Sequence, residues 1–196
     1  MTTTPDTEIA TTRVPRLHKW TADEYQEMGR AGIPGADVRT ELLDGVIYDM
    51  APIDNWHNGT VDFNSNMLVL RLRERAIIRT QGSFRLSSFS EPQPDILVLR
   101  PRKDYYRDSR VSPAEVLLVI EVSDSTLSHD RNVKLPLYAA DGITEVWIVN
   151  RKDRRVEVYR DPMERKFGTV LHASGDDLVS PLAFPDVAIR AGDITG

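Results

Sequence analysis

Residues 117–124 read LLVIEVSD, a run of branched apolar residues that contains one acid, Glu121, before its polar end. Residues 94–100, PDILVLR, are similar, with Asp95 at the start of the apolar run. Both runs are apolar on both faces, which is typical of central strands in a sheet covered on both sides. An ionised carboxylate in such a strand costs several kcal/mol unless a partner compensates it. The two acids therefore indicate either a shared cation site or two separate structural partners.

Length and composition narrow the class of protein. The chain has 196 residues, of which 40% are hydrophobic, and this predicts one compact domain at residues 16–196 after a disordered leader at residues 1–15. The absence of cysteine excludes disulfides and thiolate zinc sites. We see no apolar segment long enough for a secretory signal or a membrane span, so we expect a cytoplasmic protein with no membrane partner.

The charge is unevenly distributed along the chain. The net charge of −5 argues against a protein that coats nucleic acid through bulk positive charge. Residues 71–85 nevertheless carry five arginines against one glutamate, and residues 100–110 carry five basic residues against two acids. Such clusters can bind phosphates, and the alternative is that they are solvated helix and loop faces. The charged segment 101–113 is also unusually long for a loop in a compact domain, which favours a functional role.

The N-terminal part of the chain predicts a helix followed by a hairpin. Thr21 and Glu24 have the spacing of a capping box, so a short helix is expected from about residue 22. Asp44-Gly45 is a two-residue turn between strand-forming runs, which predicts a β-hairpin. Counting outward from that turn sets Glu41 opposite Tyr48, so Glu41 is a third acid on a strand.

The remaining segments predict a mixed α/β (α+β) domain with a central sheet and helices packed against it. Helical spacing of apolar residues predicts a long helix over about residues 56–78, and the alternation in SFRLSSF predicts a strand at 83–89. A second helix is expected from about residue 128 to Gly142, with Pro136 in its first turn or at a kink. Three further strands follow it.

Three acids and one lysine form a candidate site. Glu41, Asp95 and Glu121 all belong to predicted strands, and Lys134 follows shortly downstream. Mg²⁺ takes oxygen ligands, typically one or two carboxylates with waters and substrate phosphate. A lysine beside such a centre can position an attacking water or neutralise a phosphate. Spacing alone leaves open the alternative that each acid has its own salt-bridge partner.

The ordered block of motifs at residues 94–160 carries a resemblance to a known family. PDILVLRP, LLVIEVSDST and DRNVKLPLYAADGITEVWIVNRKDRRVEVYR resemble the Uma-type restriction endonucleases of the PD-(D/E)XK nuclease superfamily. The resemblance extends over about residues 20–184. It implies a restriction-endonuclease-like core, a mixed central sheet flanked by helices, and hydrolysis of DNA phosphodiester bonds that depends on Mg²⁺, with Mn²⁺ as a substitute.

The resemblance also implies roles for individual residues. Asp95 and Glu121 match the metal-binding acids of the family, and the main-chain carbonyl of Val122 would complete the set of ligands. Lys134 matches a lysine displaced onto the following helix, where it would orient or deprotonate the attacking water. Glu41 matches the N-terminal glutamate of the family and would steady a metal-bound water or a second ion.

Other positions carry alternatives. Ser123 stands where the superfamily usually has a lysine two residues after the acid, so catalysis would depend on Lys134 reaching the site from the helix. His57 matches a frequent histidine of the family and is a candidate substrate contact, with a polar helix-end residue as the alternative. Asp130 and Arg131 could belong to the site or form a helix cap and a surface pair.

The sequence thus predicts a Mg²⁺-dependent DNA endonuclease, with DNA across the two basic segments. The candidate substrate contacts there are Arg71, Arg73, Arg75 and Lys103. The main alternative is a protein of nuclease fold that binds nucleic acid or another partner without cutting it. A third possibility is a folded domain without this activity, in which all the acids are held in salt bridges. We also expect a homodimer, because many nucleases that cut both strands are symmetric dimers.

Overall fold

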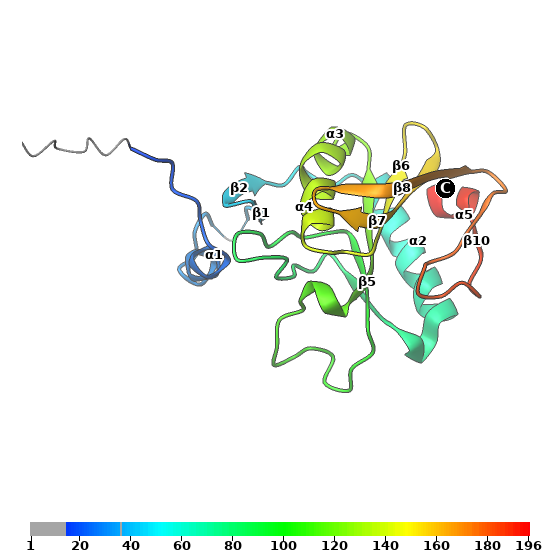
Figure 1. Cartoon of the computed structure of the whole chain (residues 1–196), viewed down its shortest axis with the longest axis horizontal. Coiled ribbons are helices and arrows are strands. Elements are labelled where there is room, and N and C mark those ends of the chain that lie inside the picture. The colour runs from blue at the N-terminus through cyan, green and yellow to red at the C-terminus, as the bar shows by residue number, and fades with distance from the viewer. Residues whose placement is uncertain (1–14, 36) are drawn as a thin grey trace, which may run out of the picture.

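The structure is a computed structural model, and it describes residues 15–35 and 37–196. The predicted leader at residues 1–15 lies outside the described residues, apart from Pro15. The described chain forms a mixed sheet with helices on both faces, which confirms the predicted fold class (Figure 1). No helix within residues 15–35 and 37–196 is long and apolar enough to cross a membrane.

The central sheet has six strands in the order β3-β4-β5-β6-β7-β8. Their bounds are β3 Ile77–Thr80, β4 Ile96–Leu99, β5 Val116–Ser123, β6 Glu145–Asn150, β7 Arg155–Met163 and β8 Lys166–Ser174. The β5–β6 pair is parallel and the other four pairs of the sheet are antiparallel. The strands predicted around both acids and the three strands predicted after the second helix are therefore confirmed. Two short strands, β9 Leu178–Val179 and β10 Ile189–Arg190, pair with each other outside this sheet.

A helical crossover connects the parallel strands β5 and β6. It consists of α3 Leu127–His129, a π-helical turn Asp130–Lys134 and α4 Leu135–Ala140. Proline lacks an N–H and its ring clashes with the carbonyl four residues earlier, so Pro136 cannot lie inside a regular α-helix. The π turn ends just before Pro136, which falls in the first turn of α4, and Gly142 (φ 77°) follows the end of the helix. The predicted helix is thus present, with a widened turn in its middle.

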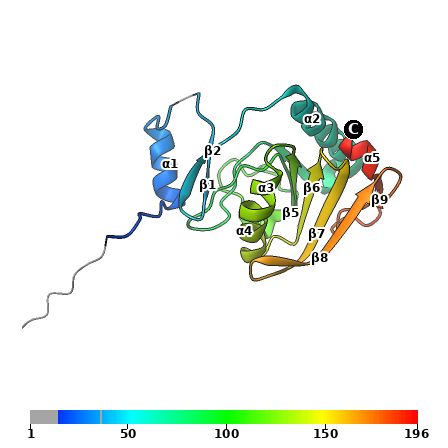
Figure 2. The same ribbon diagram turned by 90° about the horizontal axis from the view of Figure 1, so that it is seen from above.

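Helix α2 (Asn55–Leu72) covers one face of the sheet together with α5 (Ala191–Thr195), while the crossover covers the other face (Figure 2). Asp54 caps α2, since its side chain accepts a hydrogen bond from the His57 N–H at 2.8 Å. The predicted extension of this helix to residue 78 is wrong. The chain leaves the helix at Arg73, whose φ is 48°, and Ile78 pairs with Val98 as part of β3.

At the N-terminus, α1 (Ala22–Arg30) and the hairpin of β1 (Thr40–Leu43) and β2 (Val46–Asp49) lie at one end of the molecule (Figure 2). The capping box at Thr21 is present, and Glu41 pairs with Tyr48 as predicted. The predicted strand at 83–89 is wrong. The N–H groups of Leu86 and Ser87 both bond to the carbonyl of Ser90, at 3.0 and 3.1 Å, so the chain reverses there.

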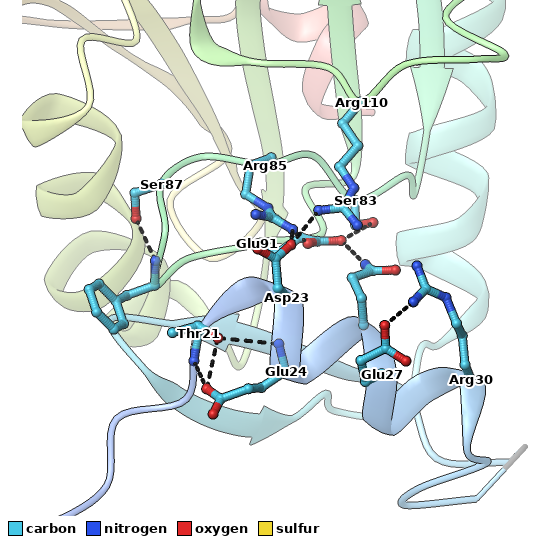
Figure 3. Close-up of polar contacts among 12 residues, drawn as sticks. Thr21, Asp23, Glu24, Glu27, Arg30, Ser83, Arg85, Ser87, Glu91 and Arg110 are labelled. Carbon is cyan, nitrogen blue, oxygen red and sulfur yellow. Dashed lines mark hydrogen bonds and ion pairs between the residues drawn. The ribbon is translucent and has the colours of Figure 1, made fainter.

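Ionic contacts join α1 to the core (Figure 3). Asp23 of α1 lies 2.9 Å from an Arg85 nitrogen and 3.0 Å from an Arg110 nitrogen. Gln26 of the same helix donates a hydrogen bond to Glu91, which is buried. Arg85 and Arg110 come from the two basic segments, so part of the positive charge in those segments is already paired within the chain.

Candidate active site

Asp95 and Glu121 lie side by side on neighbouring strands. Ile96 pairs with Ile120 in the antiparallel β4–β5 register, so the next pair along the strands is Asp95 with Glu121. The Val122 N–H donates a hydrogen bond to Asp95 Oδ2 at 2.8 Å. Side chains alternate along β5, and Val119 packs in the core cluster on the crossover side of the sheet. Glu121 therefore also faces the crossover.

The crossover brings Lys134 to these acids. Lys134 Nζ lies 2.7 Å from Glu121 Oε1, 3.4 Å from Glu41 Oε2 and 4.0 Å from Asp130 Oδ1. Tyr138, further along the same helix, donates a hydrogen bond to Glu121 Oε1 at 2.7 Å. All five side chains are buried. Lys134 therefore lies between Glu41 of the hairpin and Glu121 of β5.

Ser123 and Asp130 support the lysine. Ser123 faces the same side as Glu121, and its hydroxyl donates to Asp130 Oδ2 at 2.7 Å. Thr126 donates to the same oxygen at 2.9 Å. Asp130 therefore lies in the site and is not a surface residue. Arg131 forms no ion pair with the acids of the site. Its Nε lies 2.9 Å from Glu157 Oε2 on β7, so Arg131 has a structural role.

The hairpin contributes Glu41, which receives two further contacts. The Gln93 N–H donates to Glu41 Oε2 at 3.2 Å, and His129 Nε2 lies 3.5 Å from Glu41 Oε1. The His129 ring also packs edge-on against Tyr48, opposite Glu41 in the hairpin, with 5.1 Å between centroids. The sequence did not single out His129, because no local pattern indicates that the hairpin docks on α3.

His57, predicted as a substrate contact, lies within the site. Its Nε2 is 3.1 Å from Asp95 Oδ1, and the ring is largely buried. The hydrogen bond to Asp95 raises the pKa of His57, against the opposing effect of burial. The buried Nδ1 has no hydrogen-bond partner among the residues that the structure describes.

One cavity of about 260 Å³ is lined by Glu41, His57, Asp95, Glu121, His129, Asp130 and Lys134. Its wall is completed by residues 49–54 before α2, residues 124–126 after β5, and Arg39. Arg151 lies beside the same wall, with its guanidinium 2.7 Å from Asp124 Oδ2 and 4.6 Å from the centre of the Trp56 ring. The cavity is therefore acidic inside and has two arginines at its edge.

The acids in this cavity ionise unequally. Burial raises the pKa of Glu121 to about 8; the Lys134 charge opposes this effect, and the Asp130 and Asp95 charges add to it. Burial also acts on Glu41, but Lys134 and His129 outweigh it and lower its pKa to about 2. Burial alone would lower the pKa of Lys134, yet the surrounding carboxylates hold it above its ordinary value. Lys134 is thus a cation shared by several acids.

The residues of the cavity fit a Mg²⁺ ion that is held by two carboxylates. In the described part of the chain, no three His, Asp or Glu side chains are placed to hold a metal by themselves. Mg²⁺ does not need three, since it commonly binds one or two carboxylates and keeps waters and substrate phosphate as its other ligands. Asp95 and Glu121 supply two such carboxylates beside Val122, which also lines the cavity.

The predicted basic contacts lie elsewhere. Arg71, Arg73, Arg75 and Lys103 do not line the cavity. Arg71 donates to the Ala188 carbonyl at 2.9 Å and Arg75 pairs with Asp186 at 2.9 Å, so both hold the C-terminal segment. His57 stands at the start of α2, and at 1.5 Å per residue Arg71 is about 20 Å further along the helix. These arginines therefore lie away from the cavity, and their role as DNA contacts stays a prediction.

A comparison with known protein families identifies the family of this chain. A family model named Uma2, described as "Putative restriction endonuclease", matches residues 22–192. The chain belongs to the Uma2 family. The matched range includes every residue that lines the cavity, and the match confirms the resemblance seen in the sequence.

A solved structure shares the fold. The crystal structure of "a putative nuclease belonging to DUF820" from Anabaena variabilis ATCC 29413 matches 89% of this Uma2 chain and 97% of its own chain, with a TM-score of 0.67 and 17% sequence identity. At this identity the match shows a common architecture. No curated protein matches the chain.

Proposed function

We propose that this Uma2 protein is an endonuclease that hydrolyses phosphodiester bonds in DNA with the help of Mg²⁺ or Mn²⁺. The observation that carries the proposal is the position of Lys134, 2.7 Å from Glu121 and 3.4 Å from Glu41. Burying a lysine among acids is no efficient way to stabilise a fold, because apolar side chains of similar volume often do so equally well. Such clusters with perturbed pKa values occur preferentially at functional sites.

The balance of charge in the cavity supports a bound cation. Four acidic side chains, those of Glu41, Asp95, Glu121 and Asp130, line the cavity together with the ammonium group of Lys134. A divalent ion would offset this excess, and Asp95, Glu121 and the Val122 carbonyl would hold it. When bound, such an ion lowers the pKa of water and offsets charge on the phosphate.

The side chains of the cavity have distinct tasks in this proposal. Lys134 donates hydrogen bonds to the attacking water or to a non-bridging phosphate oxygen. Glu41, held by the Gln93 N–H and close to His129, accepts a hydrogen bond from that water and orients it. His57 fixes the carboxylate of Asp95 through its Nε2, so the acid keeps one orientation.

Substrate would enter from the side of residues 49–54 and 124–126, which form the wall of the cavity. Arg39 and Arg151 are the arginines on this side. Both can contact phosphates next to the scissile bond, because guanidinium groups bind phosphate in a bidentate manner. This location replaces the two basic segments as the proposed DNA surface.

A plasmid-relaxation assay tests the proposal. Purified protein should convert supercoiled plasmid to nicked and linear forms with Mg²⁺ or Mn²⁺, and EDTA should stop the reaction. Asp95→Ala should be inactive under the same conditions while Asp153→Ala, an acid outside the cavity, should cut normally. DNA binding without cleavage in any divalent metal would instead support the binding-protein alternative.

A further inference from the structure

A second pocket, with a volume of about 410 Å³, lies between α1 and the start of the hairpin. Ligand sites of proteins are commonly of this size, and they combine apolar walls with a few polar groups. The apolar part of this wall consists of Tyr25, Ile33, Pro34 and Val38. Ile33 is 53% exposed and Val38 is 43% exposed, so large apolar side chains stand open to a ligand. We call this space the α1 pocket.

Glu91 places a buried acceptor in the wall of the α1 pocket, since only 4% of the residue is exposed. Its Oε1 accepts hydrogen bonds from Gln26 and from Ser83 Oγ, the latter at 3.3 Å (Figure 3). Its Oε2 accepts none from a described residue, although Arg85 Nε lies 3.4 Å away. A buried polar atom without a hydrogen bond costs free energy. Glu91 Oε2 can therefore gain from a donor that a bound ligand supplies.

Gly29 keeps one side of the α1 pocket open. It belongs to α1, and its φ lies outside the left-handed region that requires glycine. A Cβ atom at this position would meet nothing within 4 Å, so packing within the described chain does not require glycine either. Glycine in a helix costs roughly 0.5–1 kcal/mol relative to alanine. The absence of a side chain at residue 29 leaves room in the pocket for a ligand.

The α1 pocket shares a wall with the cavity that holds Lys134. Gln93 lines both spaces. Thr40 of β1 lines the pocket and the next residue, Glu41, lines the cavity. Because consecutive side chains of a strand point to opposite faces, the two spaces lie on either side of β1. A nucleotide whose phosphate occupies the cavity therefore has the α1 pocket within reach.

The chemistry of the wall fits a nucleobase. A planar base fits between apolar side chains, and proteins that bind unpaired bases read them through hydrogen bonds to the base edge. An ionised carboxylate accepts hydrogen bonds and donates none. Cytosine, adenine and guanine carry an amino group that donates to such an acceptor, whereas thymine and uracil carry a carbonyl oxygen where cytosine has its amino group. Glu91 therefore favours the bases that have an amino group.

We propose that the α1 pocket binds one unpaired nucleobase with an exocyclic amino group, in the strand whose phosphate lies in the cavity. Glu91 Oε2 accepts a hydrogen bond from the amino group, and Tyr25, Ile33 and Val38 contact the ring. The inference rests on the proposed function for the origin of the base in DNA, while the recognition of the base itself needs neither metal nor cleavage.

An NMR titration with nucleosides tests the recognition apart from cleavage. Deoxycytidine and deoxyuridine have nearly the same size, and they differ in the amino group or oxygen at C4. The titration is made in EDTA and above neutral pH, which keeps Glu91 ionised, since burial raises its pKa. Deoxycytidine should bind at least about tenfold more tightly than deoxyuridine. Equal affinities, or no binding of either nucleoside, would overturn the proposal.

Two glycine variants show where the nucleoside binds. Gly29→Leu places a side chain in the open space of the pocket and should abolish the binding of deoxycytidine. Gly59→Leu is the matched control, because Gly59 is also a helical residue whose Cβ would meet nothing within 4 Å, and it lines neither the pocket nor the cavity. It should bind deoxycytidine as the wild type does. Unchanged binding in a Gly29→Leu protein that thermal melts show to be folded would contradict the proposal.

Glu91→Gln tests the reading of the amino group. An amide can donate as well as accept, so this variant should lose most of the preference for deoxycytidine over deoxyuridine. A folded Glu91→Gln protein that keeps the full preference would remove Glu91 from the recognition of the base.

The plasmid assay separates this inference from the proposed function. A protein that cuts plasmid but binds no nucleoside would refute the α1 pocket alone. A protein that prefers deoxycytidine in the way described, yet cuts no DNA in any divalent metal, would refute the nuclease proposal and leave the recognition of the base standing.

Discussion

Lys134 Nζ of the crossover lies 2.7 Å from Glu121 Oε1 of β5, while the hydroxyl of Ser123, two residues after Glu121 on the same face, donates a hydrogen bond to Asp130. The residue two positions after Glu121 therefore holds the turn from which Lys134 reaches this acid. Because the π turn contains both Asp130 and Lys134, a widened helical turn and the displaced lysine belong to one structural feature.

Metal binding should stabilise the protein. Millimolar Mg²⁺ or Mn²⁺ should raise the melting temperature of the wild type, because a ligand at about 100 times its dissociation constant adds roughly 2.7 kcal/mol to the stability of the native state. Glu121→Gln should abolish this shift. It should also melt no lower than the wild type without metal, since burial, together with the Asp130 and Asp95 charges, raises the pKa of Glu121 and disfavours its ionised form. A full metal shift in Glu121→Gln would remove this acid from the metal site.

The contact between Glu157 of β7 and Arg131 of the π turn should make the stability of the protein depend on pH. Burial would raise the pKa of Glu157, but its bonds with Arg131, Asn150 and Tyr159 lower it from 4.5 to about 2. A lowered pKa in the folded state contributes stability above the unfolded pKa, and this contribution is lost as the pH falls through the folded pKa. Glu157→Gln should therefore cost about 3 kcal/mol near neutral pH, and the two proteins should converge toward about pH 2.

Urea unfolding at several pH values measures this effect. Asp176→Asn, whose side chain is 99% exposed, serves as the control and should follow the wild type throughout. A difference between Glu157→Gln and wild type that stays constant from neutral to acidic pH would show that the Arg131 contact is not the cause.

The location of the DNA surface can be tested by salt dependence. Arg39→Ala and Arg151→Ala should each reduce the slope of log affinity against log salt by about one unit, because one phosphate contact is lost. Lys103→Ala, in a loop that does not line the cavity, should leave the slope unchanged. Filter-binding or fluorescence titrations over a range of salt concentrations give the slopes. A reduced slope for Lys103→Ala, with unchanged slopes for Arg39→Ala and Arg151→Ala, would show that DNA binds at the loop of residues 100–110 instead.

Much of the fold could be predicted because local rules decided it. The apolar runs beside Asp95 and Glu121 could only be buried strands, and the Asp44-Gly45 turn determined that Glu41 pairs with Tyr48. Pro136 limited where the helix could be irregular, which placed Lys134 correctly beside a break. In each case nearby residues were sufficient to specify the geometry.

The misses involve contacts between segments distant in sequence. His129 approaches Glu41 only because the hairpin docks on the crossover, and no local pattern shows this docking. Helical spacing of the apolar residues extends the predicted helix to Ile78, whereas in the structure Ile78 pairs with Val98 of β4 in the sheet. Arg71 bonds to the Ala188 carbonyl and Arg75 pairs with Asp186, and no local pattern shows these contacts with the C-terminal segment. The role of both arginines as DNA contacts stays a prediction.

The cleavage rate of the Lys134→Ala variant tests whether Lys134 takes part in phosphodiester hydrolysis. Single-turnover plasmid cleavage should fall by a factor on the order of 100 or more, as when a group that stabilises the transition state is removed, while the protein remains folded and still gains stability from Mg²⁺. Lys134→Arg should also be impaired, because a planar guanidinium does not fit a place shaped for an ammonium group. Wild-type cleavage rates in a folded Lys134→Ala variant would contradict the account.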